Sequence, residues 1–170
     1  MKKLQLLKAL LDLFWFFSVI AIIGLLTFAG YLIISNRPIG IPLTINGQHF
    51  SVDSMASKVV LIFGCIAYGF FAFGIYQLRA VLKLFSAKMI FEQDTIRLLN
   101  NVGKNFLISS LIVCITLFFY NAFEKSTIQL DFGGGFTSSL FSASLGLFFM
   151  VLSEVFTIAK AMKDENDLTV

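Results

Sequence analysis

The sequence has few charged residues, a single histidine and two cysteines among its 170 residues. Only 14% of the residues are charged, whereas about a quarter are charged in soluble domains. With 58% apolar residues, the chain has too little polar surface to cover a water-soluble domain of this size. These proportions predict an integral membrane protein.

The sequence also lacks the residue sets that carry catalysis or hold a cofactor. It has no Ser/His/Asp set, no glycine-rich phosphate loop beside a lysine, and no acidic cluster near its one histidine, His49. His49 has no second metal ligand nearby, which favours a solvated side chain. Cys65 and Cys114 lie in apolar runs without a CxxC partner, as small buried residues do. We therefore expect a non-enzymatic protein without metal or cofactor.

Four apolar stretches are each long enough to cross a bilayer, which takes about 20 helical residues. They cover residues 13–34, 59–78, 106–123 and 136–158. We expect a single all-α integral membrane domain, a bundle of four transmembrane helices. Lysines before the first stretch also suit a secretory signal peptide, but the run is too long and no small-residue cleavage site follows it. A retained first helix is therefore favoured.

Lysine and arginine are unevenly shared between the two sides of this bundle. Only Arg37, Lys58 and Lys125 fall on one side. The other side holds ten: Lys2, Lys3, Lys8, Arg79, Lys83, Lys88, Arg97, Lys104, Lys160 and Lys163. The positive-inside rule therefore predicts a multi-pass protein of the cytoplasmic (inner) membrane, with both termini in the cytoplasm.

The loops on the opposite side predict a small β-sheet. Residues 41–52 suit a β-hairpin, because Asn46-Gly47 between alternating apolar and polar residues is a strong short-range hairpin signal. A turn there pairs Leu43 with Phe50. Residues 127–132 alternate in the same way before a run of three glycines. We expect the hairpin plus this one strand to form a small extracytoplasmic sheet.

The cytoplasmic side predicts a helical loop and a short tail. Apolar residues recur at helical spacing through residues 79–105, so we expect helical extensions of the second and third spans. This basic surface suits contact with anionic lipid, and a docking role stays open. The tail, 159–170, is either frayed or able to add a strand to a partner. The candidate docking residues are Arg79, Lys83, Lys88, Arg97, Glu165, Asn166, Asp167, Leu168, Thr169 and Val170.

Two features lie within the fourth span. Ser138, Ser142 and Gly146 are four residues apart, and small residues at this spacing let helices approach closely. We favour packing within the chain over a homo-oligomer face. Glu154 is a carboxylate inside an apolar run, near the inner end of the helix. Pairing with Arg79, Lys104 or Lys8 is favoured, and ion or proton coupling is the alternative.

Two segments resemble a known family. Residues 91–99 read FEQDTIRLL, with Gly103 after them, and residues 165–170 read ENDLTV. Both resemble an uncharacterised bacterial four-span family, domain of unknown function 2975. Thr95 and Glu92 depart from the family pattern, which has Asn and Thr there.

The resemblance implies a membrane protein that works beside a DNA-binding partner, because such proteins are often encoded next to a very small helix-turn-helix regulator. Direct nucleic-acid binding is not expected. The favoured function is a docking or regulatory module for a cytoplasmic partner. The alternative is a small oligomeric transporter or channel that uses Glu154 as its coupling group.

Overall fold

Helices dominate the structure, a computed structural model that describes residues 2–34, 43–45, 48–50, 55–124 and 134–167. The four helices are α1 (Lys2–Ile34), α2 (Met55–Ser86), α3 (Gln93–Glu124) and α4 (Gly134–Asp167). Each contains a stretch long and apolar enough to span a membrane. With 32 to 34 residues apiece they reach about 50 Å, well beyond the roughly 30 Å of hydrocarbon. Each helix therefore extends past its predicted span.

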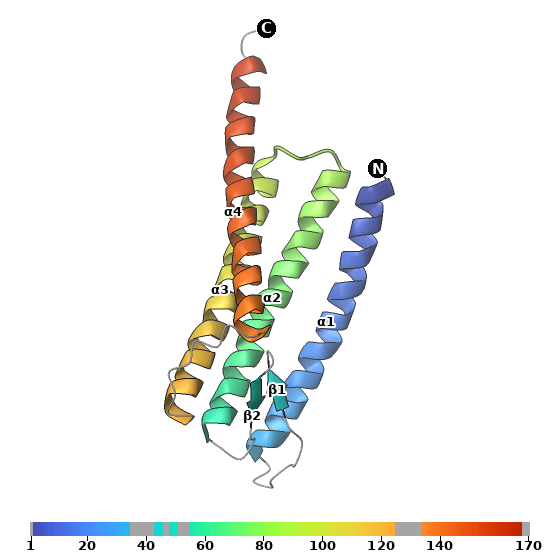
Figure 1. Ribbon diagram of the computed structural model, residues 1–170. Helices are drawn as coiled ribbons and strands as arrows, with labels where there is room; N and C mark the ends of the chain where they lie inside the picture. The colour runs from blue at the N-terminus through green and yellow to red at the C-terminus, as the bar shows by residue number, and fades with distance from the viewer. Residues whose placement is uncertain (1, 35–42, 46–47, 51–54, 125–133, 168–170) are drawn as a thin grey trace.

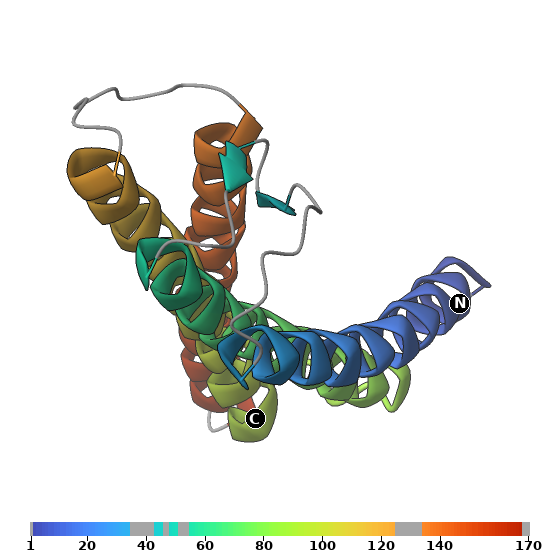
Figure 2. The ribbon, with the colours of Figure 1, turned by 90° about the horizontal axis from the view of Figure 1, so that it is seen from below.

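The helices pack in the order of the sequence rather than as a closed ring. α2 packs on α3 and α3 on α4, while α1 packs on α2. Figure 1 shows the helices side by side, and the view in Figure 2 shows α1 diverging from the side where α4 lies. The most deeply buried large side chains, Val81, Leu99 and Val102, lie between α2 and α3. The bundle is therefore tight in its middle and open between α1 and α4.

The connection from α2 to α3 is a tight, hydrogen-bonded turn. Lys88 has a φ of 62°, the left-handed conformation that commonly ends helices. The N–H of Lys88 donates to the carbonyl of Phe85, and the N–H of Met89 donates to that of Leu84. The hydroxyl of Thr95, which is fully buried, donates to the carbonyl of Met89 at 2.7 Å. This turn fixes the two helical extensions relative to each other.

Small and hydroxylated residues set the contact between α3 and α4. A Cβ built on Gly103 would lie 2.5 Å from the carbonyl oxygen of Gly146, so the two backbones touch there. On either side of this crossing, Ser110 donates to the carbonyl of Ser139 and Ser153 donates to that of Ile96. Such contacts suit a bilayer, where lipid offers helices no hydrophobic drive to associate.

The prediction that the fold includes a small three-stranded sheet is wrong. The described residues contain only β1 (Leu43–Ile45) and β2 (Gln48–Phe50), three residues each, with Leu43 opposite Phe50. No third strand occurs among the described residues, and residues 127–132 lie outside them. Two such short strands are too small for a layer of the fold. The domain is a bundle of four helices.

Candidate functional site

An ion pair joins α1 to α2. The Nε of Arg79 donates to the carboxylate of Asp12, and the guanidinium lies 4.6 Å from the ring centre of Trp15. Trp15 in turn contacts Tyr76, with ring centres 5.9 Å apart. Arg79 is therefore engaged in helix packing rather than presented on an exposed docking face. Sequence reasoning gave Asp12 no weight, because one acid at the edge of an apolar run carries no signal of its partner.

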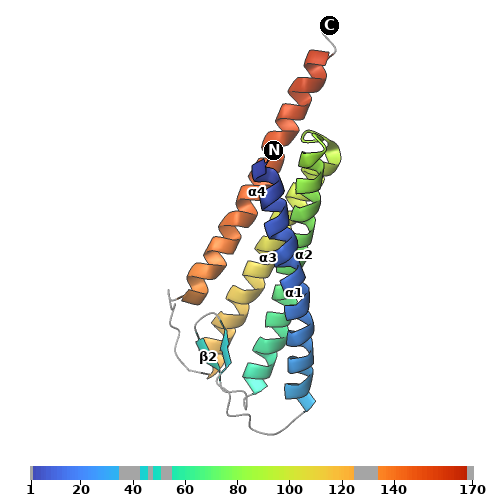
Figure 3. The same ribbon diagram turned by 90° about the vertical axis from the view of Figure 1, so that its right-hand side faces the viewer.

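The end of α4 projects beyond the rest of the bundle. Lys160 donates to the side chain of Gln93, the first residue of α3, at 3.4 Å. Residues 161–167 continue as helix for about 10 Å past that contact. Residues 161–166 are all exposed, and Met162 has 64% of its surface accessible. Figures 1 and 3 show this end of α4 standing clear of the other helices.

The other candidate docking residues are divided between two places. Lys83, Lys88 and Arg97 are exposed near the turn between α2 and α3. Glu165 and Asn166 are exposed on the projecting end of α4, where Asp167 is the last helical residue. This segment is thus helical where the sequence left a frayed tail or an added strand open. Leu168, Thr169 and Val170 lie outside the described residues.

Glu154 is exposed on α4 near the charged end of the bundle. Its neighbour Ser153 bonds to the carbonyl of Ile96 at 3.1 Å, so Glu154 lies level with the first turns of α3. In the described part of the chain, Glu154 makes no ion pair, and Arg79 pairs with Asp12 instead. The favoured pairing of Glu154 with Arg79, Lys104 or Lys8 is therefore not found.

The three small residues of α4 divide between two surroundings. Gly146 lies against Gly103 of α3. Ser138 and Ser142 instead line a cavity of about 330 Å³, which also contacts α1, α2 and α3. The Oγ of Ser142 is buried without a hydrogen-bond partner among the described residues.

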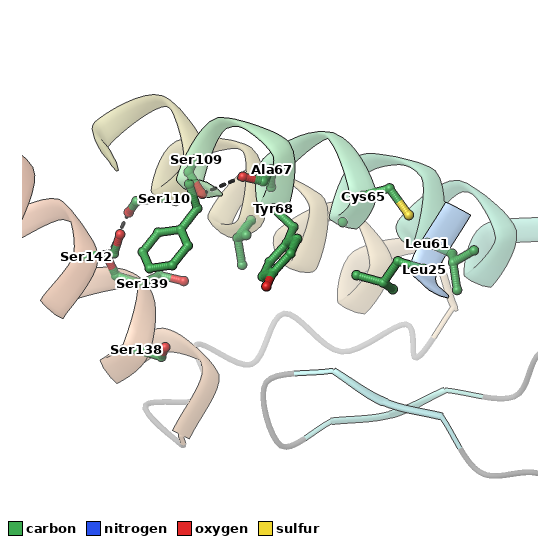
Figure 4. Close-up of a pocket in the computed structure, with 13 residues that line it drawn as sticks. Leu25, Leu61, Cys65, Ala67, Tyr68, Ser109, Ser110, Ser138, Ser139 and Ser142 are labelled. Carbon is green, nitrogen blue, oxygen red and sulfur yellow. Dashed lines mark hydrogen bonds between the residues drawn. The ribbon is translucent and has the colours of Figure 1, made fainter. Parts of the chain in front are cut away.

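The cavity has one hydroxylated wall and one apolar wall, shown in Figure 4. Its residues are Leu25, Leu61, Gly64, Cys65, Ala67, Tyr68, Phe71, Ser109, Ser110, Val113, Ser138, Ser139 and Ser142. Ser109 and Ser110 already donate to the carbonyls of Ala67 and Ser139, each at 2.8 Å. Sequence reasoning missed Tyr68, although a tyrosine at the middle of a span is an available signal, since tyrosines prefer membrane interfaces.

No metal centre emerges from the described residues. They contain no group of three or more His, Cys, Asp or Glu side chains that could hold an ion. Two features could therefore bind a partner or ligand: the charged, projecting end of α4 and the hydroxyl-lined cavity within the bundle.

These features define a multi-pass membrane protein with four spanning helices in contact with the bilayer. The sequence model of one family matches residues 5–170, nearly the whole chain. The chain belongs to that family, which is described as a protein of unknown function (DUF2975). No curated protein and no solved structure matches it.

Proposed function

We propose that the chain is an inner-membrane docking module that holds a cytoplasmic protein at the membrane and catalyses no reaction. Both termini lie in the cytoplasm in this proposal, on the support of the ten-to-three distribution of lysine and arginine. The projecting end of α4, residues 161–167, is the observation that carries it. This helix end extends past the other described helices and offers a partner an exposed helical surface.

The chemistry of that helix end indicates the kind of partner. Met162 gives it an exposed apolar contact, and Asp164 and Glu165 outweigh Lys163 and give it a net negative charge. A basic protein complements such a surface, because opposite charges steer association and fix its orientation. A small helix-turn-helix regulator is a protein of this kind, since DNA binding requires a basic surface.

Transport has less support. Glu154 lies level with the charged first turns of α3, rather than at the middle of the spans. An intramembrane coupling group is expected to face a polar partner or a water-filled path within the bundle. Glu154 is instead exposed on α4.

Photocrosslinking in living cells tests the docking proposal. A photoreactive residue at Met162 is expected to capture a small, basic cytoplasmic protein, and one at Phe141, exposed at 67% nearer the other end of α4, is not. Reversing the charges of Asp164 and Glu165 should abolish the Met162 adduct, whereas Glu154→Gln should leave it unchanged. Equal capture from both positions, or no protein adduct at Met162, would contradict the proposal.

A further inference from the structure

Tyr68 carries a hydroxyl at the centre of the second apolar span. It is central in the apolar run 59–78, and its ring contacts Phe71 with centres 6.4 Å apart. Tyr68 makes no hydrogen bond to any residue that the structure describes. Figure 4 shows the hydroxyl pointing away from α2, on the side where Ser138 and Ser139 of α4 lie. A polar group without a hydrogen-bond partner in hydrocarbon costs several kcal/mol, so a bound molecule that forms a hydrogen bond with the Tyr68 hydroxyl would be stabilised.

The cavity around Tyr68 offers a partner both polar and apolar contacts. The unpaired Oγ of Ser142 lies on its hydroxylated side, and Leu25, Leu61 and Val113 form its apolar side. Among the residues that the structure describes, the cavity lining contains no Lys, Arg, Asp, Glu or His. A charged group would enter with no counter-charge, so the ligand is uncharged. The volume of about 330 Å³ suits a polar head with the first part of an apolar chain, at the small end of ligand sites.

The position of the cavity indicates where the ligand comes from. Leu25 of α1 and Ser138 of α4 both line it, yet α1 packs on α2 and α4 packs on α3. α1 and α4 therefore do not pack closely on each other, although both line the cavity, and the apolar spans on that side face lipid. A molecule dissolved in the bilayer can enter laterally without crossing water.

We propose that this cavity binds an uncharged, oxygen-bearing amphiphile of the bilayer, of the diacylglycerol type. Its free hydroxyl and ester carbonyls would exchange hydrogen bonds with Tyr68 and Ser142, and its chains would pass out between α1 and α4. The site is independent of the docking surface, since it lies within the spans and the projecting helix end lies outside them.

Photolabelling tests this site with the purified full-length chain in phosphatidylcholine vesicles. The probe is a diacylglycerol that carries a diazirine on one acyl chain. Tyr68→Phe keeps the ring and is expected to lower labelling about fivefold, the worth of one hydrogen bond. Gly64→Val should narrow the cavity and lower labelling more strongly, because a Cβ at Gly64 meets no atom within 4 Å and Gly64 lines the space.

Matched controls separate occupancy from folding. Tyr31→Phe removes a hydroxyl from an exposed tyrosine of α1, and Gly69→Val adds the same side chain to α2 outside the cavity lining. Both are expected to label like the unmodified chain. If all four variants label alike, the cavity is not the binding site and the proposal is wrong.

Competition identifies the ligand class. Unlabelled diacylglycerol should displace the probe, whereas anionic phosphatidylglycerol and free glycerol should not. Equal displacement by phosphatidylglycerol would overturn the uncharged head group, and displacement by glycerol would overturn the bilayer origin.

Discussion

The crossing of α3 and α4 makes a sharp prediction about stability. A Cβ at Gly103 would lie 2.5 Å from both the carbonyl oxygen of Gly146 and the Cγ of Met150. A Cβ at Gly146 would lie 2.8 Å from the carbonyl oxygen of Gly103. Carbon–oxygen contacts at helix interfaces are normally about 3.3–3.6 Å. Gly103→Ala must therefore push the helices apart by about 0.8 Å, because the main obstacle is backbone.

The magnitude follows from two opposed terms. Overpacking of a tight contact costs about 1–3 kcal/mol. Replacing glycine by alanine within a helix gains up to about 1 kcal/mol. Gly69→Ala is the matched control, because a Cβ there meets no atom within 4 Å and only the gain remains. The difference between the two variants, about 1–3 kcal/mol, therefore isolates the clash. Once the helices have separated, Gly146→Ala should add less than its separate cost.

Thermal unfolding in detergent micelles measures this difference. The two native cysteines, Cys65 and Cys114, are half-buried in α2 and α3, so their reaction with a thiol-reactive fluorophore reports unfolding. Each kcal/mol is expected to lower the midpoint by about 2–4 °C for a chain of this size. Equal midpoints for Gly103→Ala and Gly69→Ala would refute the inference that the backbones touch at this crossing.

Three further predictions concern the inner half of the bundle, each checked by the same thermal assay. Arg79→Ala removes both the ion pair with Asp12 and the stacking on Trp15, and should lower the free energy of unfolding by about 1–2 kcal/mol. Arg79→Lys should restore only part of this loss. Full restoration by lysine would show that charge alone matters. Thr95→Val keeps the buried shape but removes the hydrogen bond to the Met89 carbonyl, and should cost about 1 kcal/mol; an unchanged midpoint would mean that this bond contributes nothing. Lys88→Gly relieves a positive φ and should stabilise by about 1 kcal/mol, and a lowered midpoint would contradict that reason.

The spans were predictable because one physical property decides them. Each of the four long helices contains a predicted apolar stretch, since burial in hydrocarbon requires about 20 apolar residues in a row. The helix ends were harder to predict. The turn after α2 has Lys88 at positive φ. A glycine at this position would have predicted the end of the helix from the sequence, but a lysine does not.

The candidate sites depended on contacts that one sequence does not contain. Asp12 and Arg79 are 67 residues apart, and the sequence alone does not show which of the many basic residues pairs with a given acid. Glu154 drew attention because it is a carboxylate in an apolar run, yet its exposure comes from the open packing of the bundle. Tyr68 escaped notice for the opposite reason, because an aromatic residue blends into an apolar run and only the cavity beside it reveals its hydroxyl.

The spacing of the small residues along α4 determines which of them contact α3 and which face the cavity. Residues four apart on a helix drift by about 40° at each step, so the line from Ser138 through Ser142 to Gly146 leaves the cavity and ends on α3. Residues seven apart drift by only about 20°. Ser139, Gly146 and Ser153 follow that spacing, and each one contacts α3. The carbonyl of Ser139 accepts a hydrogen bond from Ser110, Gly146 lies against the backbone of Gly103, and Ser153 donates to the carbonyl of Ile96. The seven-residue line therefore carries the packing of α4, while Ser138 and Ser142 lie off that line and face the cavity, which Ser139 also borders.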